Sequence, residues 1–338
     1  MKQVRFVLLA AVCLGASALA HGAEKDDVFA AAKLLSRGVN FGNALEAPTE
    51  GEWGVTLQEE YFAEIARAGF NSIRVPIRWS SHAQAEPPYA IDSKFFERID
   101  WVIEQALSRG LAVVINVHHY EGMDRNPEKH LPRLLALWRQ IGERYRVRPP
   151  RVFFELLNEP HDKLTDELWN GMIPGLLRVI RETNPERAVV VGPGHWNGIH
   201  SLAKLELPET DRRLIVTIHY YEPHHFTHQG APWSEGSDKW KGETWSGTEK
   251  QLAALRKDFD KAAAWGQEHG RPLYLGEFGS YEVAPMDSRV MWTRSVAGEA
   301  ERRRISWCYW EFGAGFGVFD RTMGKWREEL RQALLRHN

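Results

Sequence analysis

The sequence predicts a single-domain α/β fold, a (β/α)8 TIM barrel, and three features of the 338-residue chain support this prediction. Short runs rich in β-branched residues alternate with longer helical patterns, eight times in about 300 residues, a length that suits such a barrel with insertions. The run at 111–116, LAVVIN, shows no polar alternation, as expected of strands buried on both faces of a parallel sheet. An open doubly wound sheet is the alternative, but GVNFGNALE (38–46) matches its glycine-rich first turn poorly.

The elements follow in order along the chain. The apolar runs predict strands at Gly38–Gly42, Ser72–Ile77, Ala112–Val117, Val152–Leu157, Ala188–Gly192, Leu214–His219, Leu273–Gly276 and Ile305–Tyr309. Helical periodicity predicts helices at Leu57–Ala68, Phe95–Arg109, His130–Tyr145, Thr165–Glu182, Thr248–His269 and Asp287–Arg303, with a short one at Ser201–Leu205. The long segment Glu222–Trp245 is rich in His, Trp and Gly, so we expect a functional loop there. No repeat or linker is visible, so residues 34–338 are assigned to one catalytic domain.

The first residues have the pattern of an export signal. Lys2 and Arg5 precede an apolar run, and Ala18-Leu19-Ala20 forms a small-residue cleavage site. We therefore expect a signal peptide over residues 1–20, cut near Ala20, and a short N-terminal segment over residues 21–33. The mature protein is expected to be secreted, extracellular or periplasmic, with no membrane attachment. Because cleavage would leave a single cysteine, we expect no disulfide bond.

Composition restricts the partners. The formal net charge is -2, which gives no attraction to nucleic acid or to an anionic membrane. The chain carries 14 Trp, more than a core of this size normally uses, and sugar rings offer a flat apolar face to such side chains. We assign five Trp residues to the core, because they lie on helical patterns: Trp138, Trp169, Trp265, Trp292 and Trp326. Packing and sugar binding stay equal alternatives for Trp196, Trp233, Trp240 and Trp245.

Polar and aromatic side chains gather at the ends of the predicted strands, where the loops of a barrel share one mouth. In chain order they are Asn43 and Glu46, Arg74, His118 and His119, Asn158 and Glu159, His219 and Tyr221, Glu277, and finally Trp310 and Glu311. The strand ends therefore predict a catalytic mouth.

Glu159 and Glu277 end the fourth and seventh strands and should face each other across this mouth. Glycoside hydrolysis needs such a pair, one carboxyl to protonate the leaving oxygen and one to attack. A separation of ~5–5.5 Å would give a retaining double displacement. Arg74 is expected to keep Glu277 ionised, while Glu159 in a drier setting keeps its proton longer. Because neighbours on a strand face opposite ways, Asn158 and Glu159 can share the site only if the pleat breaks before Pro160.

Two rival readings remain. Glu155 should lie ~13 Å deeper than Glu159, at ~3.3 Å per residue, and form an ion pair inside the barrel rather than act in catalysis. The pair His118-His119 is the candidate for a metal site, but no third ligand at workable spacing is evident, so we predict no metal and no cofactor. His118 and His219 are expected instead to brace the acids, and Trp310 to stack against sugar.

With these positions assigned, the chain resembles glycoside hydrolase family 5, the cellulase family. The resemblance runs through GVNFGNALEAP, SIRVPIRW, NVHH, FELLNEPH, HYYEP, LGEFG and YWEFGAGFG, and FTHQGA (226–231) is similar to compact bacterial endoglucanases, some of which also act on mannan. It implies Glu159 as acid/base, Glu277 as nucleophile, and a first shell of Arg74, His118, Asn158, His219, Tyr221 and Trp310. It also implies sugar contacts from Asn43, Glu46, His119, Trp233 and Glu311, and a cis peptide at Trp310-Glu311.

These observations together predict a secreted, retaining endo-β-1,4-glucanase that acts as a monomer on polysaccharide or oligosaccharide. An endo-β-1,4-mannanase or a mixed-linkage glucanase is the alternative. A metal-dependent barrel hydrolase and a sugar-binding barrel without activity are the competing classes, and the presence of both carboxyls speaks against the second.

Overall fold

Eight parallel strands close into a barrel in the computed structural model, which describes residues 28–335. The strands are β1 (Arg37–Asn40), β2 (Ser72–Val75), β3 (Ala112–Asn116), β4 (Val152–Glu155), β5 (Val189–Val191), β6 (Leu214–His219), β7 (Leu273–Glu277) and β8 (Ser306–Tyr309). Each strand pairs with the next in sequence order, and β8 pairs with β1. The predicted (β/α)8 barrel is thus confirmed and the open doubly wound sheet is wrong. The predicted signal peptide lies outside the described residues.

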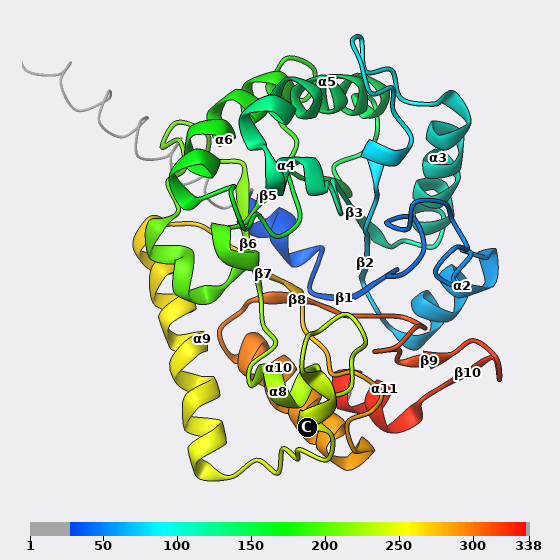
Figure 1. Cartoon of the computed structure of the whole chain (residues 1–338), viewed down its shortest axis with the longest axis vertical. Coiled ribbons are helices and arrows are strands. Elements are labelled where there is room, and N and C mark those ends of the chain that lie inside the picture. Colours follow the sequence, from blue (N-terminus) through cyan, green and yellow to red (C-terminus); the bar gives the residue numbers. More distant parts are fainter. Residues whose placement is uncertain (1–27, 336–338) are drawn as a thin grey trace, which may run out of the picture.

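Helices form a ring around the strands (Figure 1). The long ones are α2 (Glu59–Ala68), α3 (Ser93–Leu107), α5 (Pro127–Tyr145), α6 (Asp166–Arg181), α9 (Glu249–His269) and α10 (Met286–Arg302), and all six were predicted to within a few residues. Local capping fixes several of their ends. Asp92 accepts hydrogen bonds from two backbone amides at the start of α3, and Thr248 and Gln251 form a capping box at the start of α9.

Several short elements were not predicted. They are α4 (Glu121–Arg125), α7 (Gly194–Asn197), α8 (His224–Thr227), the 3-10 turns η1 (Trp79–Ser81) and η3 (Ser237–Trp240), the hairpin β9 (Phe319–Asp320) and β10 (Lys325–Trp326), and the C-terminal helix α11 (Glu328–Leu335). The predicted short helix at Ser201–Leu205 is part of a 3-10 turn, η2 (Ile199–Lys204). Trp326 lies on β10 and not on a helix, although it does pack against the core. Within residues 28–335, no helix has both the length and the apolar character needed to cross a membrane.

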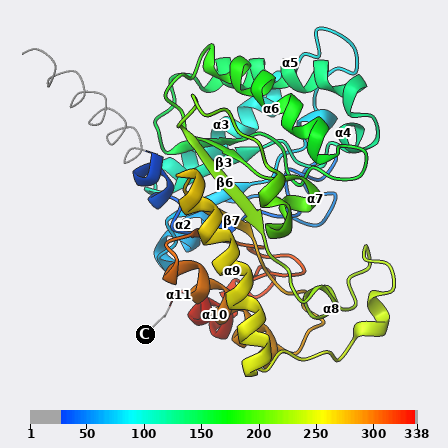
Figure 2. The same cartoon turned by 90° about the vertical axis from the view of Figure 1, so that its left-hand side faces the viewer.

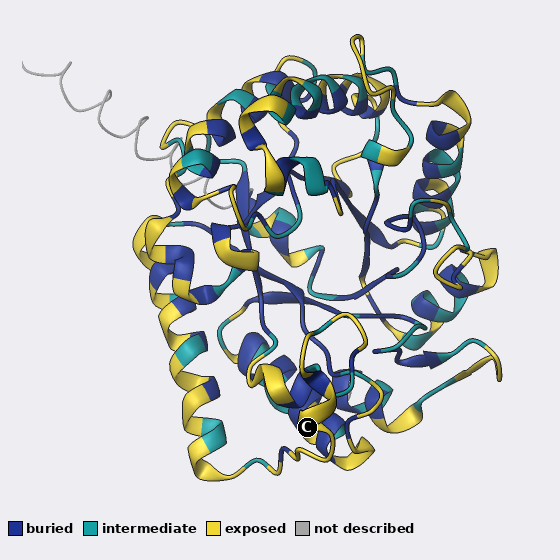
Figure 3. Cartoon of the chain, in the orientation of Figure 1, coloured by how far each residue is buried: buried dark blue, intermediate teal, exposed yellow. Residues whose placement is uncertain are grey.

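The larger apolar core lies between the barrel and its helices, so the strands are buried and the outward faces of the helices exposed (Figure 3). Trp138, Trp169 and Trp292 are fully buried there, and Trp265 nearly so, as predicted. Trp245 is also buried, which assigns it to packing rather than to ligand binding.

A second, smaller core fills one end of the barrel interior, and we call it the floor. It consists of Val28, Ala32 and Leu35 from the N-terminal segment, packed against Ala112, Val114, Phe153, Ala188, Val190, Ile215, Tyr274 and Cys308. Residues 28–33 are helical and close this end, while the loop that carries α8 projects from the opposite end (Figure 2). Residues 28–33, which belong to the predicted N-terminal segment, therefore pack as part of the floor.

Candidate active site

One arginine organises the mouth of the barrel. Arg74 on β2 is fully buried, and its Nε and Nη2 donate to the two oxygens of Glu155, each at 2.7 Å. Its Nη1 donates to Glu277 Oε1 at 2.7 Å and to Asn40 Oδ1 at 2.9 Å, and Nη2 also donates to Asn158 Oδ1 at 2.7 Å. A buried guanidinium needs such partners, because an unpaired charge in a dry interior is very costly.

Glu155 pairs with Arg74 inside the barrel, which confirms its predicted structural role. Strand β4 ends at Glu155 rather than continuing to Leu157. One nitrogen of Arg74, Nη2, donates to both Glu155 and Asn158, so the Glu155 side chain lies next to the charged site. Its predicted depth of ~13 Å below Glu159 stays a prediction.

Glu277, the last residue of β7, is held on both of its oxygens. Arg74 donates to Oε1, and the hydroxyl of Tyr221 donates to Oε2 at 2.9 Å. The Nδ1 atom of His219 lies 3.6 Å from the same Oε2. Burial raises the pKa of Glu277, and this rise is opposed by His219 and by the Arg74 guanidinium, which favour the carboxylate.

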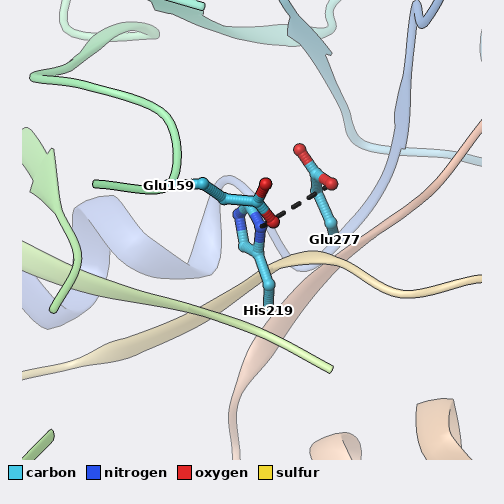
Figure 4. A group of neighbouring side chains, drawn as sticks. All are labelled: Glu159, His219 and Glu277. Atoms are coloured by element: carbon cyan, nitrogen blue, oxygen red, sulfur yellow. Dashed lines mark hydrogen bonds and ion pairs between the residues drawn. The ribbon is translucent and has the colours of Figure 1, made fainter. Parts of the chain in front are cut away.

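Glu159 enters the mouth from the loop after β4. Its φ is 47°, a left-handed conformation that breaks the pleat before Pro160, as predicted. Glu159 Oε1 lies 2.7 Å from His219 Nδ1, and Figure 4 shows Glu159, His219 and Glu277 converging on one point. Burial raises the pKa of Glu159 to about 7, against the opposing charge of Arg74. Unlike Glu277, it has no guanidinium in direct contact among the hydrogen bonds of the described residues.

The two carboxyl groups are close. One oxygen of Glu159, one of Glu277 and a ring nitrogen of His219 all lie within 4.8 Å of one another. This spacing corresponds to the ~5–5.5 Å of retaining glycosidases and falls short of the ~6.5–9.5 Å that inverting enzymes need to admit a water. The arrangement can therefore carry out attack by one carboxylate with proton delivery by the other.

Within residues 28–335, these same three side chains are the one group with spacing suited to a metal ion. A cation there would compete with the Arg74 guanidinium for Glu277. The predicted alternative at His118-His119 is not such a group. His118 Nδ1 lies 3.0 Å from the amide nitrogen of Asn116, and the two imidazole planes meet at 85°.

The other predicted residues surround the acids. The ring of His118 stacks on Trp310, with centroids 5.9 Å apart and planes at 11°. The Trp310-Glu311 peptide is cis, as predicted. His119 is exposed and its ring contacts Trp53. Trp53 was not among the predicted site residues. Trp233 is 62% exposed and rests edge-on against Tyr281, a position open to a ligand.

Glu46 and Glu311 are placed differently from the exposed aromatics. Both are almost fully buried, and each carboxylate accepts backbone amides of its own loop, Asn43 and Ala44 for Glu46, and Gly313 and Ala314 for Glu311. Burial raises the pKa of Glu46 to about 8 and that of Glu311 to about 7. Through these bonds the two carboxyls shape the loops after β1 and β8. Their contact with sugar stays a prediction.

Three buried asparagines were missed by sequence reasoning. Asn40 bridges Arg74 and the backbone of β7 and β8, Asn116 contacts His118, and Asn197 contacts His219. Asn40 and Asn116 each end an apolar strand, and a polar residue at that position is a signal that could have identified them.

Comparisons with known proteins agree with this geometry. The family model "Cellulase (glycosyl hydrolase family 5)" matches residues 36–315. Endoglucanase H of Acetivibrio thermocellus is 35% identical over 305 residues, which is 90% of this chain but 32% of the relative, and cellulase/esterase CelE of the same organism is 29% identical over 90% of this chain and 40% of the relative. The chain thus spans well under half the length of these two relatives.

Solved structures match over nearly their whole length. Thermotoga maritima Cel5A in complex with mannotriose has a TM-score of 0.90 and 49% identity, covering 91% of this chain and 99% of that one. The structure of the same enzyme with cellobiose gives a TM-score of 0.90 and 50% identity, with the same coverage. The cellulose synthase subunit Z of Clostridioides difficile has a TM-score of 0.86 and 38% identity, covering 89% of this chain and 99% of that one.

Proposed function

Because this chain belongs to glycosyl hydrolase family 5, the cellulase family, and is therefore a glycoside hydrolase, we propose that it is a secreted, retaining endo-β-1,4-glucanase. The observation that carries the mechanism is the approach of Glu159 and Glu277 to within 4.8 Å, oxygen to oxygen. Three relatives named endoglucanases match 86–90% of this chain, and they support β-glucan as the substrate class.

In the first step a Glu277 oxygen attacks the anomeric carbon, and the bond to the leaving sugar breaks as Glu159 gives its proton to the leaving oxygen. The contacts of Arg74 and Tyr221 favour the ionised, attacking form of Glu277. Burial, which raises the pKa of Glu159 to about 7, supplies a protonated acid near neutral pH. The product is a glycosyl ester on Glu277.

In the second step water attacks the same carbon, Glu159 takes a proton from that water, and Glu277 leaves as a carboxylate. Two inversions give net retention. Asn158 Oδ1 accepts a hydrogen bond from Arg74, which leaves Asn158 Nδ2 to donate to the sugar 2-OH as positive charge develops on the ring. The Trp310 ring, backed by His118, supplies a flat face for the sugar that receives the attack.

Mannan is the alternative substrate, and one observation favours keeping it. A structure similar to this chain over 91% of its length was solved with mannotriose, and another with cellobiose. The two sugars differ at the 2-OH, so the environment of Asn158 decides between them. We propose glucan as the main substrate and mannan as a secondary one.

A panel of soluble polysaccharides tests the proposal. Carboxymethylcellulose, mixed-linkage β-glucan, glucomannan, galactomannan and xylan are compared by reducing-end release, with the Glu277→Gln protein as a matched blank. Anomeric proton NMR of the first product reports the stereochemistry. We expect fastest release from β-glucans, with retained configuration and activity that survives exhaustive chelation. Inverted product, or hydrolysis of none of the five polymers, contradicts the proposal.

Export is proposed on the sequence pattern of residues 1–20 alone. Expression of the full chain in a bacterial host, followed by fractionation and N-terminal sequencing, should give a processed protein that starts near His21 outside the cytoplasm. Size-exclusion chromatography of the same material tests the predicted monomer. An unprocessed cytoplasmic product contradicts the signal assignment.

A further inference from the structure

An unusual turn after β5 brings a buried amide beneath the acid/base residue. His195, Trp196 and Asn197 have φ values of 50°, 57° and 55°, so three successive non-glycine residues are left-handed. Trp196 is left exposed by this turn, while Asn197 is fully buried. A β-bridge between Gly198 and His219 fixes the turn against β6. The Nδ2 atom of Asn197 then lies 3.4 Å from His219 Nε2.

Two glycines keep room for this contact. A Cβ atom at Gly192 would lie 2.3 Å from Asn197 Oδ1, and one at Gly276 would lie 3.1 Å from His219 Nε2. Both are closer than ordinary packing allows. A side chain at Gly192 would displace the Asn197 amide, and one at Gly276 would collide with the Thr217 hydroxyl oxygen and crowd the imidazole.

The chemistry of the contact fixes the position of a proton. An amide nitrogen only donates, so the ring nitrogen that it approaches, Nε2, must be the acceptor. A neutral imidazole carries one proton, which therefore sits on Nδ1, and Nδ1 is the atom 2.7 Å from Glu159 Oε1. We propose that Asn197 is a positioning residue that holds His219 as the Nδ1-protonated tautomer, so that His219 donates a hydrogen bond to Glu159.

The surroundings of His219 favour the neutral ring. Burial lowers the pKa of His219 to about 4, Glu277 and Glu155 oppose this, and Arg74 reinforces it. The charged and titratable groups that face His219 and Glu159 come from β2, β3, β4, β6 and β7 and the loops that follow them, and they are Arg74, His118, Glu155, His161, Tyr221 and Glu277. None of them is placed on the Nε2 side by a hydrogen bond of the described residues, so Asn197 is the group that decides the tautomer.

Asn116, which contacts His118, differs from Asn197 because both ends of its side-chain amide have hydrogen-bond partners. Its Oδ1 accepts from the backbone amide of Ile77 at 3.2 Å while its Nδ2 approaches His118. Asn197 Oδ1 has no hydrogen-bond partner among the described residues. A substitution at Asn197 therefore removes the contact of its side chain with His219 without breaking any other side-chain hydrogen bond of the described residues.

This role rests on the proposed function, in which Glu159 loses its proton in the first step and regains one from water in the second. A hydrogen bond donated by His219 stabilises the ionised Glu159. The second step needs that form, because only a carboxylate can accept the proton of the attacking water. Asn197 would thus support removal of the sugar from Glu277 more than its attachment.

Nitrogen-15 NMR of histidine-labelled protein tests the tautomer directly, because protonated and unprotonated ring nitrogens resonate far apart. The His219 signals are assigned by their loss in His219→Gln. We expect a protonated Nδ1 and an unprotonated Nε2 in the wild-type chain. Asn197→Asp keeps the shape, suits the left-handed backbone and can only accept when ionised, so it should move the proton to Nε2. A wild-type His219 with its proton on Nε2 overturns the proposal, whether or not the chain hydrolyses glucan.

The kinetic test uses an aryl cellobioside with a good leaving group, for which the second step limits kcat. In Asn197→Asp the acid limb of the kcat profile should move up by roughly one pH unit, because ionised Glu159 loses its donor. Thr217→Val is the matched control: Thr217 is buried on β6 two residues before His219, and its hydroxyl has no hydrogen-bond partner within residues 28–335. This variant should leave both the tautomer and the acid limb unchanged. An acid limb that does not move in a folded, active Asn197→Asp overturns the proposed role, whereas a wild-type chain inactive on all glucans would instead contradict the proposed function.

Discussion

The mouth and the floor of this barrel are built on the same strands and differ in what the inward-facing positions carry. On β4, Phe153 belongs to the apolar floor, and Glu155, two residues on and therefore on the same face, binds Arg74. On β3, Val114 and Asn116 are related in the same way. One step of the pleat thus separates a dry core from a charged site. The site therefore rests on a dry layer, which supplies the burial that raises the pKa of its carboxyls.

Loss of the proposed nucleophile at the mouth should abolish turnover while leaving the floor intact. Glu277→Gln removes the proposed nucleophile, and turnover of β-glucan should fall by about 10⁴-fold or more. Oligosaccharide binding, measured by calorimetry, should stay close to wild type, since the substituted side chain keeps its size. Arg74 keeps its two bonds to Glu155, so thermal unfolding should change little. Hydrolysis near the wild-type rate would show that another group attacks the sugar.

Glu159→Gln should have the next largest effect, and it depends on the leaving group. For polysaccharide, kcat/KM should fall by about 10²–10⁴-fold, because the leaving oxygen needs a proton. For an aryl glycoside with a good leaving group, kcat/KM should fall far less.

The pH profile provides the control for Glu159. Since the acid works when protonated and its pKa lies at about 7, wild-type kcat/KM on polysaccharide should decline as pH rises through about 7. That alkaline limb should vanish in Glu159→Gln. Equal losses on both substrates, or an alkaline limb that persists in the variant, would assign the proton to a different residue.

The sequence predicts those features of the mouth and the barrel that depend on short stretches of the chain. The closed barrel follows from eight apolar runs, and Glu159 and Glu277 follow from their places at strand ends. The contact of Arg74 with Glu277 was predicted from their strand-end positions, and an ion pair of Glu155 inside the barrel was also predicted. That Arg74 is the partner of Glu155, 81 positions away, has no local pattern that fixes it. Asn197 is also distant from His219 in sequence, and its left-handed turn has no glycine to mark it.

The floor was missed for a different reason. Val28, Ala32 and Leu35 have the spacing of one helix face. They follow shortly after the predicted signal peptide, in the stretch that was predicted as a short N-terminal segment rather than as a packed helix. Without residues 28–35 the barrel would leave one end of its interior open to water, so their burial depends on the assembled barrel rather than on the segment itself.

A change at the floor should lower stability and leave the pH dependence of hydrolysis unchanged, whereas a change at the mouth should lower activity and leave stability unchanged. Leu35→Ala deletes a fully buried side chain, so the free energy of unfolding should fall by about 3 kcal/mol. Denaturant titration measures this, with Val147→Ala, an apolar truncation at an exposed site, as the matched control expected to change stability by less than about 0.5 kcal/mol. The pH profile of hydrolysis should keep its wild-type limbs. A shifted limb would mean that floor and site are coupled.

Glu46, a residue of the mouth, should affect stability through the proton that it holds. Burial raises the pKa of Glu46 to about 8, well above its value in an unfolded chain, with a contribution from the nearby Glu311. The folded state therefore holds this proton over a range in which the unfolded state has lost it. The stability that the protonated group contributes is fully present below about pH 4.5 and is lost as pH rises through about 8.

Glu46→Gln removes this titration while keeping the size of the side chain. Relative to wild type, the variant should gain stability as pH rises from about 4.5 to about 8, by up to about 5 kcal/mol, since one pKa unit corresponds to about 1.4 kcal/mol. Denaturant titrations of both proteins at several pH values measure the difference, which cancels the pH dependence of all other groups. Glu104→Gln, a substitution on the exposed face of α3, should show no such trend. A difference that stays flat with pH would mean that Glu46 is ionised in the folded protein, held by the backbone amides of Asn43 and Ala44 strongly enough to offset its burial.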